Sequence, residues 1–177
     1  MEFEFRPLAE DDLATMHRWL NDPAVVRWWE GDDVSWEGVV RDYAPDREPD
    51  SQEHYIAALD GEDVGWISCG PVADWPDESI EWSELGADEE VGGIDYLIGD
   101  PDRRGQGVGS AMIRAFVRDI AFGEHHEWTQ VGADPAEDNS GSWGALASVG
   151  FRQLGTYGDD DGEWRVMVFD RSQLSSD

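Results

Sequence analysis

The most informative segment of the sequence is the glycine-rich stretch from Gly99 to Gly109, which follows a predicted strand and opens the clearest helix of the chain. Gly105, Gly107 and Gly109 carry no side chains, so the backbone amides around them can approach a ligand closely. The start of a helix adds unpaired N–H groups and the positive end of the helix dipole. Together these features predict a binding site for a phosphate or a pyrophosphate.

Two arginines, Arg103 and Arg104, precede these glycines. A guanidinium can bind a phosphate through two parallel hydrogen bonds, so both residues are candidates for the same site. A Walker loop is excluded, because the sequence contains no Gly-Lys-Ser or Gly-Lys-Thr. The spacing G-x-G-x-G also differs from the G-x-G-x-x-G of dinucleotide-binding folds. The alternative to an anion site is an ordinary loop with a flexible helix start.

Three aspartates are candidates for acid–base chemistry or for binding a cation. Asp95 interrupts an otherwise apolar segment just before the glycine-rich turn, and a buried carboxylate needs a partner. Asp134 follows the next predicted strand, and Asp161 lies in the turn 159–162. A carboxylate beside an amine can hold the ammonium form and accept its proton. Each aspartate also has a structural explanation, because Asp is common in turns and at strand ends.

Two tryptophans and the possible metal ligands are further candidates for binding. Trp28 and Trp29 either pack in the core or form the wall of a binding site, since aromatic side chains bury large areas in both places. No metal site is expected, because Cys69 is the only cysteine and His125 and His126 have no cysteine or further histidine at ligand spacing along the chain.

The elements that must position these residues follow from the periodicity of apolar side chains. We expect strands at residues 2–6, 54–59, 64–68, 91–98, 128–132, 151–157 and 164–170, and helices at 8–20, 36–43, 107–122 and 139–148. Residues 71–90 are acidic and are predicted to form a long loop, with a short turn of helix as the alternative within it, and the tail from Arg171 is expected to fray. This order predicts an α/β fold of the mixed α+β kind, with a mostly antiparallel sheet and helices on both faces.

The composition bounds the class of protein. A chain of 177 residues predicts a single domain spanning residues 1–177. The net charge of -29 argues against nucleic acid as a partner, and no apolar run approaches the roughly 20 residues that span a bilayer. All 12 basic residues are Arg against 41 acidic residues, which indicates either a surface adapted to high salt or attraction of a cationic substrate. A single cysteine fits a reducing cytoplasm.

The run from Arg104 to Gly109 resembles the pyrophosphate motif of the GNAT acetyltransferases, Gln/Arg-x-x-Gly-x-Gly/Ala. The segment 134–139 and the later Gly150-Phe151 pair resemble that superfamily's next element, in which an Asn meets the cofactor. Segments from about Phe5 to Phe169 also resemble the aminoglycoside 6'-N-acetyltransferases of the type Ib group in order and spacing, namely Trp19-Leu-Asn21, Val25-Val-Arg-Trp-Trp29, Tyr55-Ile-Ala57, Gly93-Ile-Asp95 and Asp161-Gly162.

The resemblance implies the GNAT acyl-CoA N-acyltransferase fold, acetyl-CoA as the cofactor and direct acetyl transfer to a small-molecule amine. It implies that Asp95 is the catalytic base, and that Trp28, Trp29, Asp95, Asp134 and Asp161 bind the acceptor. It implies cofactor contacts from Tyr96, Ile98, Arg103, Arg104, Gly105, Gln106, Gly107, Val108, Gly109 and Asn139. Many family members carry a Tyr that protonates the leaving thiolate, and here Leu146 stands in that place.

Three alternative functions remain at this point. A siderophore-pathway acetyltransferase acting on N6-hydroxylysine shares the same layout. A CoA-binding module without catalysis is kept open by Leu146. A protein or lysine acetyltransferase needs an open peptide groove, which the long 71–90 segment argues against. The expected oligomeric state is a monomer or a homodimer.

Overall fold

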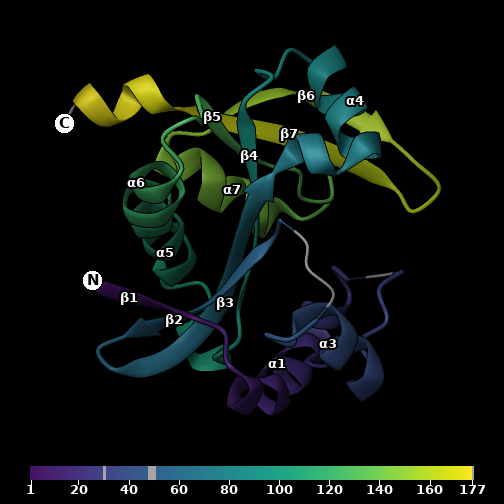
Figure 1. Cartoon of the computed structure of the whole chain (residues 1–177), viewed down its shortest axis with the longest axis vertical. Helices are drawn as coiled ribbons and strands as arrows, with labels where there is room; N and C mark the ends of the chain where they lie inside the picture. The colour runs from purple at the N-terminus through teal and green to yellow at the C-terminus, as the bar shows by residue number, and fades with distance from the viewer. Residues whose placement is uncertain (30, 48–50, 177) are drawn as a thin grey trace.

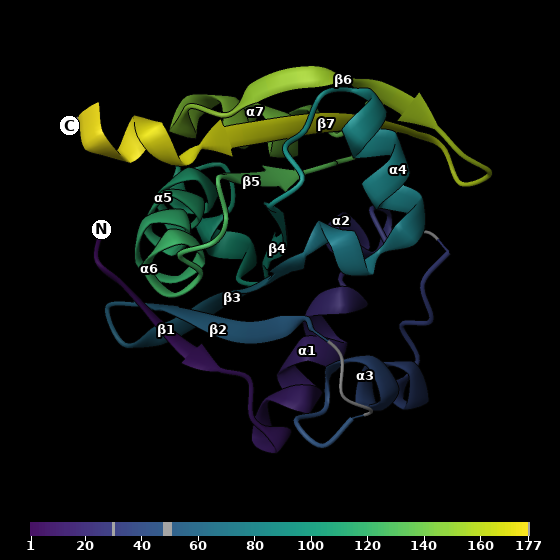
Figure 2. The same ribbon diagram turned by 45° about the horizontal axis from the view of Figure 1, so that its top comes forward.

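The structure, a computed structural model, describes residues 1–29, 31–47 and 51–176. Within these residues seven strands form one sheet in the order β1-β2-β3-β4-β5-β7-β6. The pair β4–β5 is parallel and the other five neighbouring pairs are antiparallel. Helices α5 and α6 lie on one side of the sheet and α1 and α3 on the other (Figures 1 and 2). The predicted mixed, mostly antiparallel sheet with helices on both faces is confirmed.

The strands are β1 Phe3–Pro7, β2 Glu53–Leu59, β3 Glu62–Pro71, β4 Val91–Ile98, β5 Gln130–Ala133, β6 Arg152–Gly158 and β7 Glu163–Asp170. The α-helices are α1 Leu13–Leu20, α2 Pro23–Val26, α3 Trp36–Tyr43, α4 Pro76–Glu84, α5 Val108–Phe116, α6 Phe122–Glu124 and α7 Ser140–Val149. Shorter 3-10 segments are Glu10–Asp12, Val72–Asp74, Pro101–Arg103 and Arg171–Ser176. No helix of the described chain is long and apolar enough to cross a membrane.

The core lies on both faces of the sheet, because successive side chains of a strand point to opposite sides. On one face Ile67 and Ile94 pack with Met112 and Phe116, which form the buried stripe of α5. On the other face lies a second cluster, built from Met16, Leu20, Val39, Ile56, Trp66 and Leu97. Ile94 and Tyr96 therefore face α5 and α7, whereas Leu97, and by alternation Asp95, face α1 and α3.

Local signals in the sequence account for several element ends. The side chain of Ser35 accepts a hydrogen bond from the amide of Gly38 and caps α3. The side chain of Asn139 caps α7 in the same way, and Gly150 ends that helix in the left-handed conformation, with φ of 117°. Asp60 and Gly61 form the turn between the antiparallel strands β2 and β3.

Three expectations about the elements were wrong. Residues 71–90 contain the nine-residue helix α4, which begins at Pro76 and buries Trp82, so this region is less irregular than its acidic composition suggests. The predicted helix 107–122 changes to π-helical hydrogen bonding at Val117–Ala121. Over the described residues the tail forms the 3-10 segment Arg171–Ser176 rather than fraying, and Arg171 donates hydrogen bonds to the carbonyls of Phe122, His125 and Trp128.

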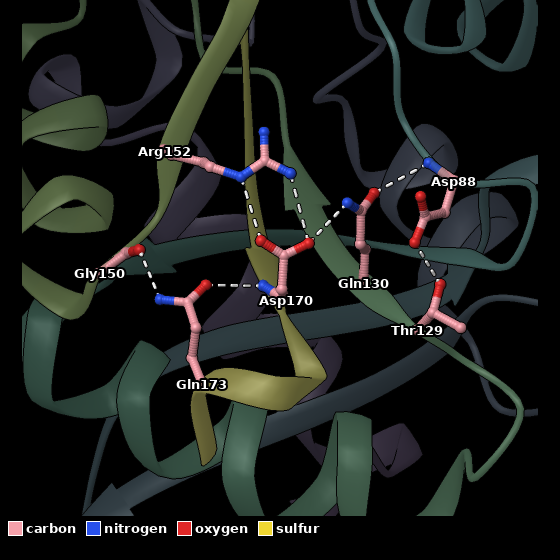
Figure 3. Close-up of polar contacts among 7 residues, drawn as sticks. All are labelled: Asp88, Thr129, Gln130, Gly150, Arg152, Asp170 and Gln173. Atoms are coloured by element: carbon pink, nitrogen blue, oxygen red, sulfur yellow. Dashed lines mark hydrogen bonds and ion pairs between the residues drawn. The ribbon is translucent and has the colours of Figure 1, made fainter. Parts of the chain in front are cut away.

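A polar network centred on the buried Gln130 holds β5 against its neighbours (Figure 3). Gln130 is buried, and its amide donates to Asp170 at 2.7 Å and accepts from the backbone of Asp88 at 2.9 Å. Arg152 on β6 binds the same Asp170 carboxylate at 3.0 Å. Because buried polar groups are costly when unpaired, this network fixes the position of β5 in the sheet.

The parallel pair β4–β5 is short. The strands pair only at Val91↔Gln130, Gly92↔Val131 and Gly93↔Gly132, and they diverge beyond that point. The indole of Trp128 packs so closely on Gly92 that a Cβ added there would lie 2.2 Å from the ring. Trp82 lies against Gly132 in a similar way, with a distance of 2.5 Å. The two tryptophans thus pack on glycines of the short paired segment, one of them in its last pair.

The close packing at Gly92 predicts a loss of stability on a minimal substitution. Gly92→Ala forces the Trp128 ring to move, and we expect the free energy of unfolding in urea to fall by about 1–3 kcal/mol, as is typical of overpacking. Gly144→Ala in α7 is the control, because no heavy atom of the described residues lies within 4 Å of the added Cβ. It should be neutral or slightly stabilising, since Ala favours helix over Gly. Equal effects of the two changes would contradict the packing argument.

Candidate active site

A pocket of about 490 Å³ lies where β4 and β5 diverge. Trp28, Trp29 and Tyr43 line it from the side of α1 and α3. Asn139 and Ser142, at the start of α7, line it from the other side. Between these walls run residues 94–96 of β4 and 133–134 at the end of β5. The pocket therefore connects the two faces of the sheet through the gap between the strands.

Asp95 is the central acidic residue of this pocket. Its side chain is accessible from the pocket, and no hydrogen bond to its carboxylate is found among the described residues. Although it is open to the cavity, it lies deep between layers of protein. This burial, together with the negative charges of Asp134, Asp32 and Glu78, raises its pKa to about 7. A carboxylate with a pKa near 7 is suited to accept a proton at neutral pH.

Asp134 lies across the gap at the end of β5. The hydroxyl of Tyr157 donates to its Oδ2 at 2.5 Å, and the indole N–H of Trp82 donates to the same atom at 3.1 Å. Burial raises its pKa to about 6, and the two hydrogen bonds oppose that rise. Asp134 is thus held by the hydroxyl of Tyr157 and the indole of Trp82. Of the two carboxylates that face each other across the gap, Asp95 is the one without such a partner among the described residues.

The other predicted acceptor residues reach the same pocket. Trp28 and Trp29 follow α2 and line one wall, with the guanidinium of Arg27 stacked 4.3 Å from the Trp28 ring centroid. Asp161 also lines the pocket, and its backbone amide donates to Asp159 in the turn between β6 and β7. The structure therefore brings Trp28, Trp29, Asp95, Asp134 and Asp161 together, although they are far apart in the sequence.

The pocket is strongly acidic. Eight carboxylates line it, contributed by Asp32, Asp33, Asp42, Glu78, Asp95, Asp134, Asp159 and Asp161. No arginine is among the lining residues that the structure describes. Sequence reasoning missed Asp32 and Tyr43, because nothing in their local pattern separates them from surface residues. Glu78 lies in the acidic 71–90 region, whose composition was the available signal.

On the opposite face of the sheet, the glycine-rich turn presents an open helix start. Gly107 is the N-cap of α5 with φ of 78°, a left-handed conformation that favours glycine. A Cβ added at Gly105 or Gly107 would meet no heavy atom of the described chain within 4 Å beyond the adjoining residues. Gly105, Gln106 and Gly107 are exposed, so an anion has room to approach the backbone at this helix start.

The two arginines of the turn already have partners in the protein. The guanidinium of Arg104 donates to the carbonyls of Ile98 and Gly99, at 2.8 and 3.0 Å, and to Asp22 at 3.1 Å. Arg103 pairs with Glu62 at 3.0 Å. Both guanidinium groups therefore contact the protein at the turn, whereas the sequence suggested that they would be available for a phosphate. Asp22 also caps α2, because its carboxylate accepts from the amide of Ala24 at 2.8 Å.

Two hydroxyls lie on the side of the gap that faces α5 and α7. The Tyr96 hydroxyl is 2.7 Å from the Ser142 hydroxyl, and both residues line the pocket. Asn139 also lines the pocket, and its side chain accepts from the amide of Ser142 at 3.2 Å. Ile98 is half-buried and lies 3.7 Å from the position of a Cβ at Gly109. Leu146 is fully buried in the core and has no polar atom to offer.

Comparisons with known proteins agree with this geometry. A family profile described as an acetyltransferase (GNAT) domain matches residues 9–157. An aminoglycoside N(6')-acetyltransferase type 1 of Klebsiella pneumoniae is 31% identical over 170 residues, which cover 92% of this chain and 80% of the relative. The solved structure of aminoglycoside acetyltransferase AAC(6')-Ib with coenzyme A and kanamycin has a TM-score of 0.85 at 30% identity, covering 99% of this chain and 98% of that one.

A mixed sheet that splays beside a glycine-rich helix start, with a carboxylate pocket on the opposite face, defines an acyltransferase. The profile match and the level of identity then fix the family: the chain belongs to the GNAT acetyltransferases. The family resemblance drawn from the sequence is confirmed.

The electrostatic coupling in the pocket predicts a measurable shift. Asp134→Asn removes a negative charge that raises the pKa of Asp95, so we expect that pKa to fall below about 7 in a carboxyl NMR titration. Asp119→Asn, a surface change beside Arg118, is the control and should leave the Asp95 titration unchanged.

The raised pKa of Asp95 also has a consequence for stability. Its folded value of about 7 exceeds the ordinary 3.8, so ionisation in the folded state costs stability as the pH rises from about 4 to 7. Asp95→Asn should therefore be more stable than the wild type above pH 7, with the difference vanishing below about pH 4.

In the NMR experiment on Asp134→Asn, an unchanged titration of Asp95 would contradict the electrostatic coupling between the two aspartates.

Proposed function

We propose that this protein transfers an acetyl group from acetyl-CoA directly to a primary amine of a small polycationic acceptor, such as an aminoglycoside. The observation that carries the proposal is the pocket at the β4–β5 gap. Eight carboxylates line this pocket, and the open start of α5 lies on the opposite face of the sheet. Relatives named as an aminoglycoside N(6')-acetyltransferase and a kanamycin resistance protein support the choice of acceptor.

The residues present fit acetyl-CoA on the side of α5 and α7. The amides at residues 106–109 would hold its pyrophosphate, helped by the positive end of the α5 dipole. Residues 94–98 of β4, including Tyr96 and Ile98, would lie along its pantetheine arm, with Asn139 nearby. When bound, acetyl-CoA supplies an acetyl group activated as a thioester.

The acceptor would enter from the side of α1 and α3. Its ammonium groups are attracted by the acidic lining, and Trp28 and Trp29 form a flat wall for its rings. Asp95 accepts the proton that the attacking amine must lose, because its pKa of about 7 makes it basic enough at neutral pH. Asp134 and Asp161 hold further ammonium groups and fix the orientation of the acceptor.

The backbone of β4 contributes a further interaction. Beyond Gly93 no pairing with β5 is found in the described chain, so amides of residues 94–96 on that edge have no strand partner. An N–H group there can donate to the thioester oxygen as negative charge develops on it.

The departing thiolate also needs stabilisation. Leu146 cannot supply it, but the Tyr96 hydroxyl lies in the pocket and is linked to Ser142. Burial raises the pKa of Tyr96, so its hydroxyl stays protonated at neutral pH. We assign it the role of hydrogen-bond donor to the leaving sulfur, which replaces the missing helix tyrosine.

Three wider properties belong to the same proposal. The chain forms one domain, and its excess of acidic residues over arginines suits a medium of high salt, where screening weakens self-repulsion. The free thiol of Cys69 suits a reducing compartment such as the cytoplasm. The sheet ends in the edge strands β1 and β6, and we expect the protein to be a monomer or a homodimer.

Release of free CoA tests the function directly. The assay uses acetyl-CoA with kanamycin, N6-hydroxylysine, spermidine and a peptide, in dilute buffer and in molar KCl. We expect turnover with kanamycin, and Asp95→Asn should lower kcat by about 10²–10⁴-fold, as for loss of a general base, while CoA affinity changes little.

The remaining outcomes of this assay are also informative. Activity confined to N6-hydroxylysine would mean that this amine, and not an aminoglycoside, is the acceptor. Tight CoA binding without any turnover would mean that the protein is a CoA-binding module without catalysis. Equal loss of turnover and CoA affinity in Asp95→Asn would make Asp95 structural. Asp119→Asn, outside the pocket, is the matched control for a lost carboxylate.

The proposed role of Tyr96 has its own test. Tyr96→Phe removes the hydroxyl and keeps the ring, so we expect kcat to fall at least tenfold, as for loss of a transition-state donor, while the KM for the acceptor changes little. Ser142→Ala, which removes only the partner hydroxyl, should have a smaller effect. An unchanged kcat in Tyr96→Phe would mean that water serves the thiolate.

A further inference from the structure

Three side chains with metal-binding atoms converge outside the pocket. They are Glu53 at the start of β2, Cys69 near the end of β3, and His125 just after α6. One ligand atom from each lies within 4.8 Å of the others. None of the three lines the acceptor pocket. The sequence predicted no metal site because Cys69 and His125 are far apart in the chain, but the fold brings them together.

The strand register explains the meeting. Glu53 lies directly opposite Cys69 in the antiparallel β2–β3 pair, so both side chains point to the same face of the sheet. That face is covered by α5, the π-helical segment and α6, at whose end His125 lies. Residues 108–124 extend for roughly 25 Å at about 1.5 Å per residue, so the cluster is far from the glycine-rich turn at the other end.

The distances match a compact coordination site. Cys69 Sγ lies 3.9 Å from His125 Nε2, and the same nitrogen lies 3.5 Å from Glu53 Oε1. In a tetrahedral zinc site, with bonds of about 2.3 Å to sulfur and about 2.0 Å to nitrogen or oxygen, such pairs lie roughly 3.3–3.6 Å apart. These two pairs are within a few tenths of an ångström of those spacings. The third pair, Cys69 Sγ and the Glu53 carboxylate oxygen, lies within 4.8 Å, so the Glu53 carboxylate closes the site by moving by up to about 1 Å toward the sulfur.

Neighbouring groups already orient these ligands. The Tyr55 hydroxyl donates to Glu53 Oε2 at 2.7 Å, which leaves Oε1 directed at His125. Glu127 lies 3.6 Å from His125 Nδ1, on the far side of the ring, and Trp128 stacks on that ring at 4.0 Å. A carboxylate behind the imidazole and a hydroxyl behind the carboxylate are the outer contacts that metal ligands commonly have.

A reactive thiol is a poorer explanation of the cluster. Cys69 is 1% exposed, so a substrate cannot reach it. Burial and the charges of Glu53 and Glu124 raise the pKa of its thiol, which disfavours a free thiolate nucleophile. The same carboxylates stabilise a bound cation, and a metal that binds the sulfur displaces its proton to solvent. The partly exposed Glu53 and His125 give the ion a route of entry.

We propose that Glu53, Cys69 and His125 bind one Zn²⁺ ion, with water at the fourth position. A thiolate, an imidazole and a carboxylate suit this borderline-soft, tetrahedral ion, whereas Mg²⁺ and Ca²⁺ require oxygen ligands. The ion would tie the β2–β3 pair to the loop that follows α6.

Cobalt binding to the full, metal-free chain tests the proposal. Because Cys69 is the only cysteine, a thiolate-to-cobalt charge-transfer band in the near ultraviolet reports on this site alone. We expect one Co²⁺ per chain with that band, displaced by Zn²⁺, and a rise of Tm with Zn²⁺. Cys69→Ser should abolish both the band and the Zn²⁺-dependent rise of Tm.

Two further variants separate the site from general attraction of cations by an acidic chain. Glu53→Gln keeps the acceptor for Tyr55 and should retain the band, while it weakens Co²⁺ binding about tenfold or more. His126→Gln removes the exposed neighbouring histidine and should change nothing. Absence of the band in the wild type, or equal Co²⁺ affinity in wild type and Glu53→Gln, would overturn the proposal. The Glu53→Gln comparison holds even if Cys69→Ser fails to fold.

Discussion

The organisation of this protein depends on the point at which β4 and β5 stop pairing. A sheet that paired along the full length of β4 would have no gap, and the two faces would stay separate. Glycines of the short paired segment accept tryptophan rings that leave no space for a Cβ, so the divergence is set by packing. One wedge in the sheet thus creates a passage where a thioester from one side can meet an amine from the other.

Electrostatics differ sharply between the two sides of this passage. In a chain with net charge -29, the acceptor side concentrates carboxylates, while the other side offers backbone amides at a helix start. Arg103 and Arg104 are paired internally, so the helix start offers an anion mainly backbone dipoles and N–H groups. Burial and the acidic lining together raise the pKa of Asp95, and the same lining is the part of the pocket that suits a polycation.

The sequence was sufficient for the fold class, most element bounds and the candidate residues with strong local signals. The glycine spacing, the Ser35 cap and the stripe of α5 are local patterns, and local patterns survive folding. It was insufficient where tertiary contacts decide. Helix α4 is weakly amphipathic and is stabilised by burial of Trp82. Arg104 binds the carbonyls of Ile98 and Gly99, and no sequence pattern reveals these contacts. The proximity of Cys69 to His125 depends on strand register, which becomes visible only in three dimensions.

The double use of Asp22 has a consequence for the two regions that it contacts. Its carboxylate caps α2, the helix that leads to Trp28 and Trp29, and it also binds Arg104 in the glycine-rich turn. One side chain therefore serves both regions, and loss of its carboxylate would remove the cap of α2 and an anionic partner of Arg104 at the same time. A change at Asp22 thus reaches the segment that precedes the aromatic wall as well as the turn.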